Sequence, residues 1–161
     1  MLLASLAAVL MAPLAACWSR FREHQLLKVG SPLPPEALTF ARQLGIHAPE
    51  NLRVQFVHEV PLPLPSAMAH AFSRLGFPIL SAAGMSLGRG ICAVSPDSRL
   101  LRHELVHTLQ YQRLGGHLPF MRRYLRECIH HGYATAPMEI EARDRAQEED
   151  RIPDGISPQS G

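Results

Sequence analysis

The residues with the clearest chemical potential are His103, Glu104 and His107, which lie within the segment His-Glu-Leu-Val-His. Two histidines four residues apart on a helix lie about 40° apart around its axis, one turn above the other. Their imidazoles can therefore bind one metal ion. Glu104 lies next to them around the helix, close enough to act as a base on a metal-bound water. The spacing predicts a zinc site with two protein ligands and a catalytic carboxylate.

A catalytic zinc ion needs a third protein ligand and an open position for water. The candidates are Glu139 and Glu141, in a later segment predicted to be helical. They are two residues apart, so they point about 160° from each other on a helix and only one can face the ion. The other could orient a ligand, pair with Arg143 or Arg145, or meet solvent. The residues alone leave both carboxylates open.

The stretch from His103 to Tyr111, followed by Phe120, Tyr124, Gly132-Tyr133 and the segment 137–142, resembles the small bacterial zincin-like domains of the DUF4157 type. These are related to gluzincins, the thermolysin-like metallopeptidases whose third ligand is a glutamate on a following helix. The resemblance covers about residues 84–145 and implies a zinc metallopeptidase of the HExxH type acting on peptides or proteins. It favours Glu139 as the third ligand. Arg143 departs from the family pattern, which keeps Glu141 as the alternative.

Catalysis at such a site requires groups besides the zinc ligands. Glu104 would take a proton from the zinc-bound water and deliver it to the leaving amine. The tetrahedral oxyanion needs a second donor, and Tyr133 is predicted for that role, with His130 and His131 as alternatives. By resemblance to zincins, the segment 84–94 would be the edge strand along which an extended peptide substrate pairs.

The elements that must position these residues predict a single α+β domain, zincin-like and mostly helical, with a short antiparallel sheet. A chain of 161 residues, 47% hydrophobic, has room for one core. Helices are predicted over 36–44, 66–75, 99–114, 119–131 and 138–149, and strands over 52–56 and in two pieces between 84 and 94. Pro61, Pro63 and Pro65 predict an extended loop between these groups.

The predicted helix over 99–114 has clear ends and a clear inner face. Asp97 can cap its start, and Gly115-Gly116 ends the pattern. Leu101, Leu105 and Leu109 form an apolar stripe opposite the histidines. The stripe would pack on the core and leave both imidazoles facing away from it. The alternative is a solvated face on which the two histidines bind nothing.

The N-terminal residues 1–16 contain no charged side chain and are too few for a membrane span, which needs roughly 20 apolar residues. Leu14-Ala15-Ala16-Cys17 resembles the bacterial lipobox, whose cysteine becomes the lipidated first residue. We predict a lipoprotein-type signal peptide over 1–16, a linker over 17–35, the zincin-like domain over 36–150 and a disordered tail over 151–161. The missing Lys or Arg leaves an alternative, an apolar N-terminal helix packed on the domain.

Location and partners follow from these predictions. A lipid on Cys17 would hold the protein at a membrane of the bacterial cell envelope. The formal net charge of +2 is too small to predict a nucleic-acid partner. Cys92 and Cys128 could pair in an oxidising compartment or stay as separate buried thiols.

Two other functions fit the same sequence. One is an envelope lipoprotein in which zinc holds helices together without turnover. The other is a partner-binding module that uses the proline-rich loop and the arginines Arg122, Arg123 and Arg126.

Overall fold

The computed structural model describes residues 2–61 and 82–148. Its helices are α1 Leu2–Val29, α2 Pro35–Gln43, α4 Ser98–Leu114, α5 His117–His131 and α6 Pro137–Glu148. Its strands are β1 Ser31–Pro32, β2 Arg53–Phe56, β3 Gly84–Leu87 and β4 Gly90–Ala93. Short 3-10 turns cover Pro49–Asn51 and Tyr133–Thr135. The predicted helix over 66–75, most of the proline-rich loop and the predicted tail lie outside the described residues.

The described strands form one mixed sheet in the order β1-β2-β4-β3. The α+β class is confirmed, but the prediction of an antiparallel sheet is wrong in one pairing, because β2 runs parallel to β4. A hairpin turn at Gly88, where φ is +69°, sends the chain from β3 back along β4. The central strand β4 therefore lies between an antiparallel neighbour, β3, and a parallel one, β2.

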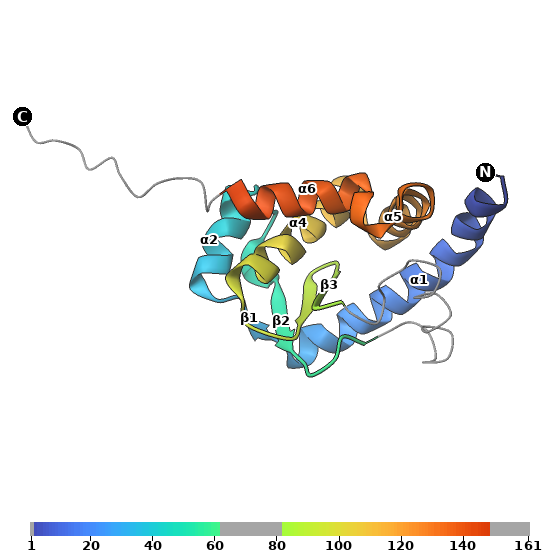
Figure 1. The fold of residues 1–161 in the computed structure, drawn as a ribbon. Helices are drawn as coiled ribbons and strands as arrows, with labels where there is room; N and C mark the ends of the chain where they lie inside the picture. The colour runs from blue at the N-terminus through green and yellow to red at the C-terminus, as the bar shows by residue number, and fades with distance from the viewer. Residues whose placement is uncertain (1, 62–81, 149–161) are drawn as a thin grey trace, which may run out of the picture.

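Helix α4 is the central element of the fold and lies between α6 on one side and the sheet on the other (Figure 1). Its leucine stripe is buried, as predicted, in a core cluster shared with α2 and the sheet. Leu101, Leu105 and Leu109 are at most 5% exposed. Burying each such side chain stabilises the fold by about 1.5 to 3 kcal/mol. The stripe therefore fixes which face of α4 turns toward α6.

The ends of α4 are set by the predicted residues. The Asp97 side chain accepts a hydrogen bond from the Leu100 backbone N–H at 2.7 Å, which caps the first turn. Gly115 adopts φ +87° after the last turn, a conformation that favours glycine. The helix begins one residue earlier than predicted and ends where predicted.

The N-terminal residues form one continuous helix, α1, which packs against α5 and extends past it at the N-terminus (Figure 1). Ala12, Ala16 and Leu26 are buried on its inner face. This is the arrangement given above as the alternative for the N-terminus. The segment predicted as a linker, 17–35, contains the second half of α1 and the strand β1. Cleavage ahead of Cys17 stays a prediction.

Among the residues that the structure describes, no helix combines the length and the apolar content required to cross a bilayer.

Candidate metal centre

Three side chains converge between α4 and α6, and we call them the metal cluster: His103, His107 and Glu139. The two imidazole Nε2 atoms are 3.1 Å apart. Glu139 Oε1 lies 3.2 Å from His107 Nε2, and Glu139 Oε2 lies 3.4 Å from His103 Nε2. One ligand atom from each residue lies within 4.8 Å of the others. The predicted pairing of two histidines with a downstream glutamate is therefore present as a juxtaposition in space.

Glu139 reaches the cluster because α6 begins at a fixed place. Pro137 occupies its first turn, and the Met138 backbone N–H donates to Glu127 Oε2 of α5 at 2.8 Å. A carboxylate at a helix N-terminus is stabilised by the helix dipole and by the unpaired N–H groups there. Glu127 thereby anchors the first turn of α6, which carries Glu139, to α5. The Glu139 side chain is 2% exposed.

Glu141, the alternative third ligand, lies outside the metal cluster. Its Oε1 accepts a hydrogen bond from Arg113 Nη1 at 3.0 Å and lies 3.6 Å from Arg145 Nη1. Its Oε2 accepts a hydrogen bond from Gln110 Nε2 at 2.9 Å. The expected divergence of the two glutamates is thus observed, and Glu139 is the one that faces the imidazoles.

Gln110 connects Glu141 to the metal cluster. Its Oε1 lies 2.8 Å from His107 Nδ1, while its Nε2 donates to Glu141 and, at 3.0 Å, to the Met138 carbonyl. Because the amide nitrogen has two acceptors, the amide oxygen is left to accept from His107 Nδ1–H. That tautomer leaves the Nε2 lone pair of His107 directed at the cluster. Sequence reasoning missed Gln110, whose only signal was its position one turn beyond His107.

Tyr124 is a second residue that sequence reasoning did not assign to the site. Its hydroxyl donates to Glu139 Oε1 at 2.7 Å, and its ring packs edge-on against His107 at 5.9 Å between centroids. Tyr124 entered the sequence analysis only among the residues that resemble zincin-like domains, without a role at the site. A tyrosine usually finds a partner for its hydroxyl when it is buried, and that was the available signal.

Glu104, the predicted base, is buried against the edge strand β3. Its carboxylate accepts a hydrogen bond from the Ser86 backbone N–H, and the residue is 4% exposed. A Cβ atom added at Gly84 would lie 2.5 Å from Glu104 Oε1, so any larger residue there would force the Glu104 side chain to shift. Burial raises the pKa of Glu104, and the neighbouring imidazoles oppose that shift. The glycine therefore allows β3 to approach the Glu104 side chain closely.

The charges within the metal cluster stabilise one another. Burial raises the pKa of Glu139, but hydrogen bonds with His103 and His107 outweigh it, and the net pKa is well below its ordinary value. For His107, burial lowers the pKa, whereas the hydrogen bond to Glu139 and the charge on Glu104 raise it above the ordinary value. The cluster thus holds a carboxylate anion that attracts a cation, either a proton or a metal ion.

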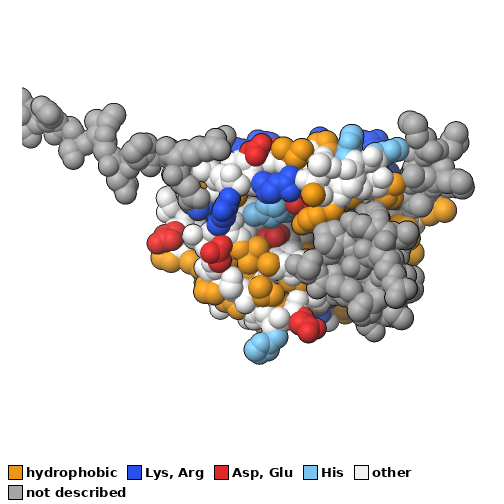
Figure 2. Space-filling view, in the orientation of Figure 1, with side chains coloured by type: hydrophobic (Ala, Val, Ile, Leu, Met, Phe, Trp, Pro, Cys, Tyr) orange, Lys and Arg blue, Asp and Glu red, His pale blue; other side chains and the backbone are white. Residues whose placement is uncertain are grey.

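A cavity of about 200 Å³ adjoins the metal cluster. Glu104 and Tyr133 line it, whereas His130 and His131 do not. Burial raises the pKa of Tyr133 far above its usual range, and Glu139 raises it further, so the hydroxyl keeps its proton. Figure 2 shows histidine and acidic side chains in the middle of the visible face, with Lys or Arg side chains beside them.

The cysteines and the arginine cluster lie apart from this chemistry. Cys92 and Cys128 are separate buried thiols, so the alternative to a disulfide is confirmed, and burial raises the pKa of Cys128 to about 12. The arginines of α5 are exposed, and Arg123 pairs with Glu127 one turn away at 2.8 Å. Their arrangement is that of a solvated helix surface.

Comparison with known proteins found no matching family model, no similar curated protein and no similar solved structure. The geometry of the metal cluster and its cavity is therefore the basis for interpreting this chain.

Proposed function

We propose that the protein is a zinc-dependent hydrolase, a peptidase in which His103, His107 and Glu139 hold the ion. One observation carries the proposal: three ligand atoms of the types that zinc prefers converge within 4.8 Å at the wall of a cavity. Two imidazoles and one carboxylate are a donor set found in catalytic zinc sites, which keep a further position open. The carboxylate charge and the Nε2 lone pair fixed by Gln110 fit such an ion.

Zinc bound there would lower the pKa of its water from 15.7 toward about 7 and would polarise a substrate carbonyl. Glu104 would accept the proton of the attacking water and return it to the leaving amine. The Ser86 N–H and the close approach of Gly84 hold the Glu104 carboxylate in one position. A fixed base needs no reorganisation at the moment of reaction, and that supports the assignment.

Tyr133 remains our proposal for the second donor to the developing oxyanion. It lines the cavity that Glu104 and the metal cluster also line, and its hydroxyl stays protonated at neutral pH. The Tyr124 hydroxyl donates to Glu139 at 2.7 Å, and Tyr133 also interacts with that carboxylate. The edge strand β3 supports a peptide substrate. Within the described residues it pairs with β4 on one side only, so an extended chain can add along its other side.

A lipid anchor at Cys17 belongs to the same proposal and would place the enzyme at a bacterial cell envelope. Cys17 is exposed on α1, where an acyl chain would meet no packed side chain. Cleavage ahead of it would remove the first half of α1, including the buried Ala12 and Ala16.

A non-catalytic zinc site is the second candidate, because the metal cluster joins α4 to α6 and an ion there would also link the two helices. Zinc-loaded wild type, Glu104→Gln and the control Glu36→Gln, an exposed glutamate on α2, distinguish the two. Each would be incubated with an unstructured protein, and new peptide termini would be identified by mass spectrometry. Hydrolysis lost only in Glu104→Gln, with zinc retained, supports the peptidase. A full zinc content with no cleavage by wild type favours the structural ion.

A further inference from the structure

Helix α1 has an outward face that contacts no other described element. Its exposed positions recur at spacings of one and three residues, which places them on one side of the helix. They are Leu10, Pro13, Leu14, Cys17, Arg20, Phe21, His24, Gln25, Lys28 and Val29. The opposite side of α1 packs on the domain, so the helix has two distinct faces.

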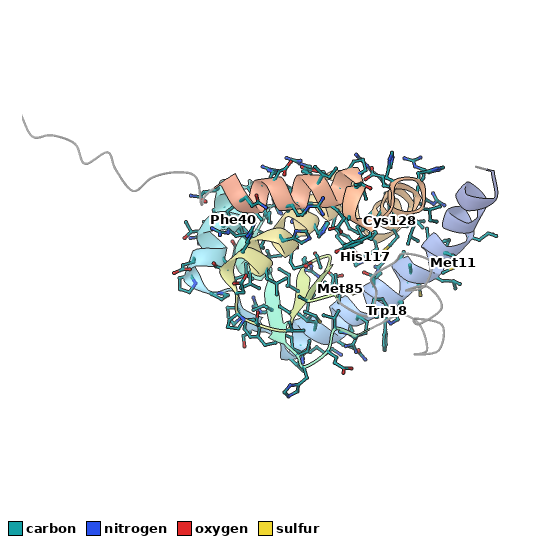
Figure 3. The ribbon with its side chains drawn as sticks, viewed as in Figure 1. Met11, Trp18, Phe40, Met85, His117 and Cys128 are labelled. Atoms are coloured by element: carbon teal, nitrogen blue, oxygen red, sulfur yellow. The ribbon has the colours of Figure 1, made fainter. Side chains whose placement is uncertain are left out.

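The orientation of α1 is fixed by a group of polar contacts that we call the α1 clasp: Ser19, Glu23, His117 and their partners. Ser19 Oγ lies 2.9 Å from His117 Nδ1 and 3.1 Å from the Tyr111 hydroxyl. Glu23 Oε2 lies 3.0 Å from His117 Nε2, and Glu23 Oε1 accepts the Arg89 backbone N–H at 2.9 Å. Figure 3 shows His117 between α5 and α1. The helix therefore cannot rotate to bury its outward face.

The outward face exposes large apolar side chains to water. Leu10 is 65% exposed, Leu14 73%, Phe21 58% and Val29 68%. Scattered single apolar residues are ordinary on a protein surface, but these share one side of one helix. Residues 2–9, which precede them in the same helix, contain no charged residue. Such a face is stabilised when an apolar phase covers it.

The charges on α1 indicate what that phase is. Arg20, Arg22 and Lys28 all lie in its second half, and its single acidic residue, Glu23, is turned inward in the α1 clasp. The outward face is thus apolar toward the N-terminus and basic toward the C-terminus. Anionic lipid bilayers offer an acyl interior bordered by phosphate groups, which matches that order.

As the alternative to cleavage and a lipid on Cys17, we propose that the chain that keeps residues 1–16 docks on an anionic membrane through Leu10, Leu14 and Phe21 of α1. The N-terminal end of the helix enters the boundary between headgroups and acyl chains, and Arg20 and Lys28 contact lipid phosphates. At its N-terminal end α1 extends past α5 (Figure 1). Because Ala15 and Trp18 line the cavity, docking also holds the candidate metal centre near the bilayer.

The test uses the full chain, with Cys17 shown by mass spectrometry to be unmodified, in flotation assays with vesicles. One set contains phosphatidylcholine and phosphatidylglycerol, and the other contains phosphatidylcholine alone. We expect binding to the anionic vesicles, and a decrease of about tenfold or more in partition coefficient for Leu14→Asp. The double variant Arg20→Glu with Lys28→Glu should lose the preference for anionic vesicles. Cys17→Ala should bind as wild type does.

The matched control is Val94→Asp, which places the same charge on another exposed apolar residue, 41% exposed and outside α1. It should bind as wild type does. Circular dichroism and thermal unfolding establish that each variant is folded. Absence of wild-type binding, or an equal loss in Val94→Asp, overturns the proposal. Sedimentation without lipid tests whether a second copy of the chain, rather than a membrane, packs on the outward face of α1. The proposal is also overturned if wild type is a dimer that does not bind vesicles and Leu14→Asp is a monomer.

Discussion

Two clusters of described residues pair histidine with glutamate, and they differ in how the imidazole nitrogens are arranged. In the α1 clasp, His117 uses Nδ1 for Ser19 and Nε2 for Glu23, so both nitrogens end on protein partners. In the metal cluster, the Nε2 atoms of two histidines converge on one carboxylate. Ligand atoms that converge create a position for a cation, whereas imidazole nitrogens that bond to separate partners hold two helices together.

The surroundings of the two clusters differ in the same sense. The metal cluster borders a cavity that is also lined by a second carboxylate, Glu104. In the α1 clasp, Ser19 is fully buried and its hydroxyl has no route to a substrate. The two clusters therefore teach that residue types identify candidates, and that access and the arrangement of the imidazole nitrogens separate a site from a structural contact.

Removing one imidazole from each cluster tests most directly whether the two clusters have different roles. We expect His107→Ala to lower zinc affinity by more than about a hundredfold, because it removes a ligand, whereas loss of an outer partner costs 10- to 100-fold. His117→Ala should leave zinc affinity unchanged and lower only stability. Competition titration with a chromogenic chelator measures the zinc affinity of both variants. Equal zinc affinity in His107→Ala and wild type would remove the distinction.

A smaller effect is expected at the residue that sets the tautomer of His107. Gln110→Ala should lower zinc affinity by about 10- to 100-fold, because His107 Nδ1 loses its acceptor. Gln112→Ala is the control, since that side chain lies on the same helix and, within the described residues, hydrogen-bonds the backbone of His47 instead of the metal cluster. The same titration applies, and an equal response of the two variants would contradict the role of Gln110.

The contact between β3 and the base gives a third prediction. Gly84→Ala should push the Glu104 carboxylate aside and reduce peptide cleavage by about tenfold or more, while the zinc content stays at the wild-type level. Overpacking of this kind costs about 1 to 3 kcal/mol in stability. Cleavage rates and zinc analysis on the same samples check it. Undiminished cleavage by Gly84→Ala would show that the position of Glu104 against β3 is unimportant.

The α1 clasp provides a prediction on stability and its pH dependence. Burial raises the pKa of Glu23, but hydrogen bonds from His117 and Arg89 outweigh it and lower the net pKa. A lowered folded pKa means that the carboxylate stabilises the fold above the unfolded value of about 4.3, and that this is lost as pH falls through the folded value. Glu23→Gln should therefore cost about 1.5 to 3 kcal/mol at pH 7 and little in acid. Denaturant unfolding of wild type and Glu23→Gln at pH 7 and in acid measures the stability lost in the variant. That loss would be the same at the two pH values if the clasp were not ionic.

The sequence was sufficient where a local pattern has one physical solution. The spacing of His103 and His107, the leucine stripe of α4 and the glycines after it determine one helix and its orientation. The 160° divergence of Glu139 and Glu141 predicted that only one could face the imidazoles, and the resemblance favoured the one that does.

The rest depended on contacts between segments far apart in the chain. The parallel pairing of β2 with β4 depends on how the hairpin of β3 and β4 docks, which no local pattern records. Gln110, Tyr124 and Gly84 join the site only through packing of α4 against α6, α5 and β3. The predicted boundary at Cys17 follows from the apolar first half of α1, which resembles a leader, whereas the packing of α1 on α5 and the sheet depends on segments far apart in the chain.

Zinc stoichiometry in wild type, Glu139→Ala and Glu141→Ala tests the central claim most directly. Both variants remove a carboxylate from the same helix, but only Glu139 lies in the metal cluster. We predict one zinc ion per chain in wild type and in Glu141→Ala, and none retained by Glu139→Ala after dialysis. A wild-type protein that binds no zinc, or one that loses it with Glu141→Ala and keeps it with Glu139→Ala, would contradict the account.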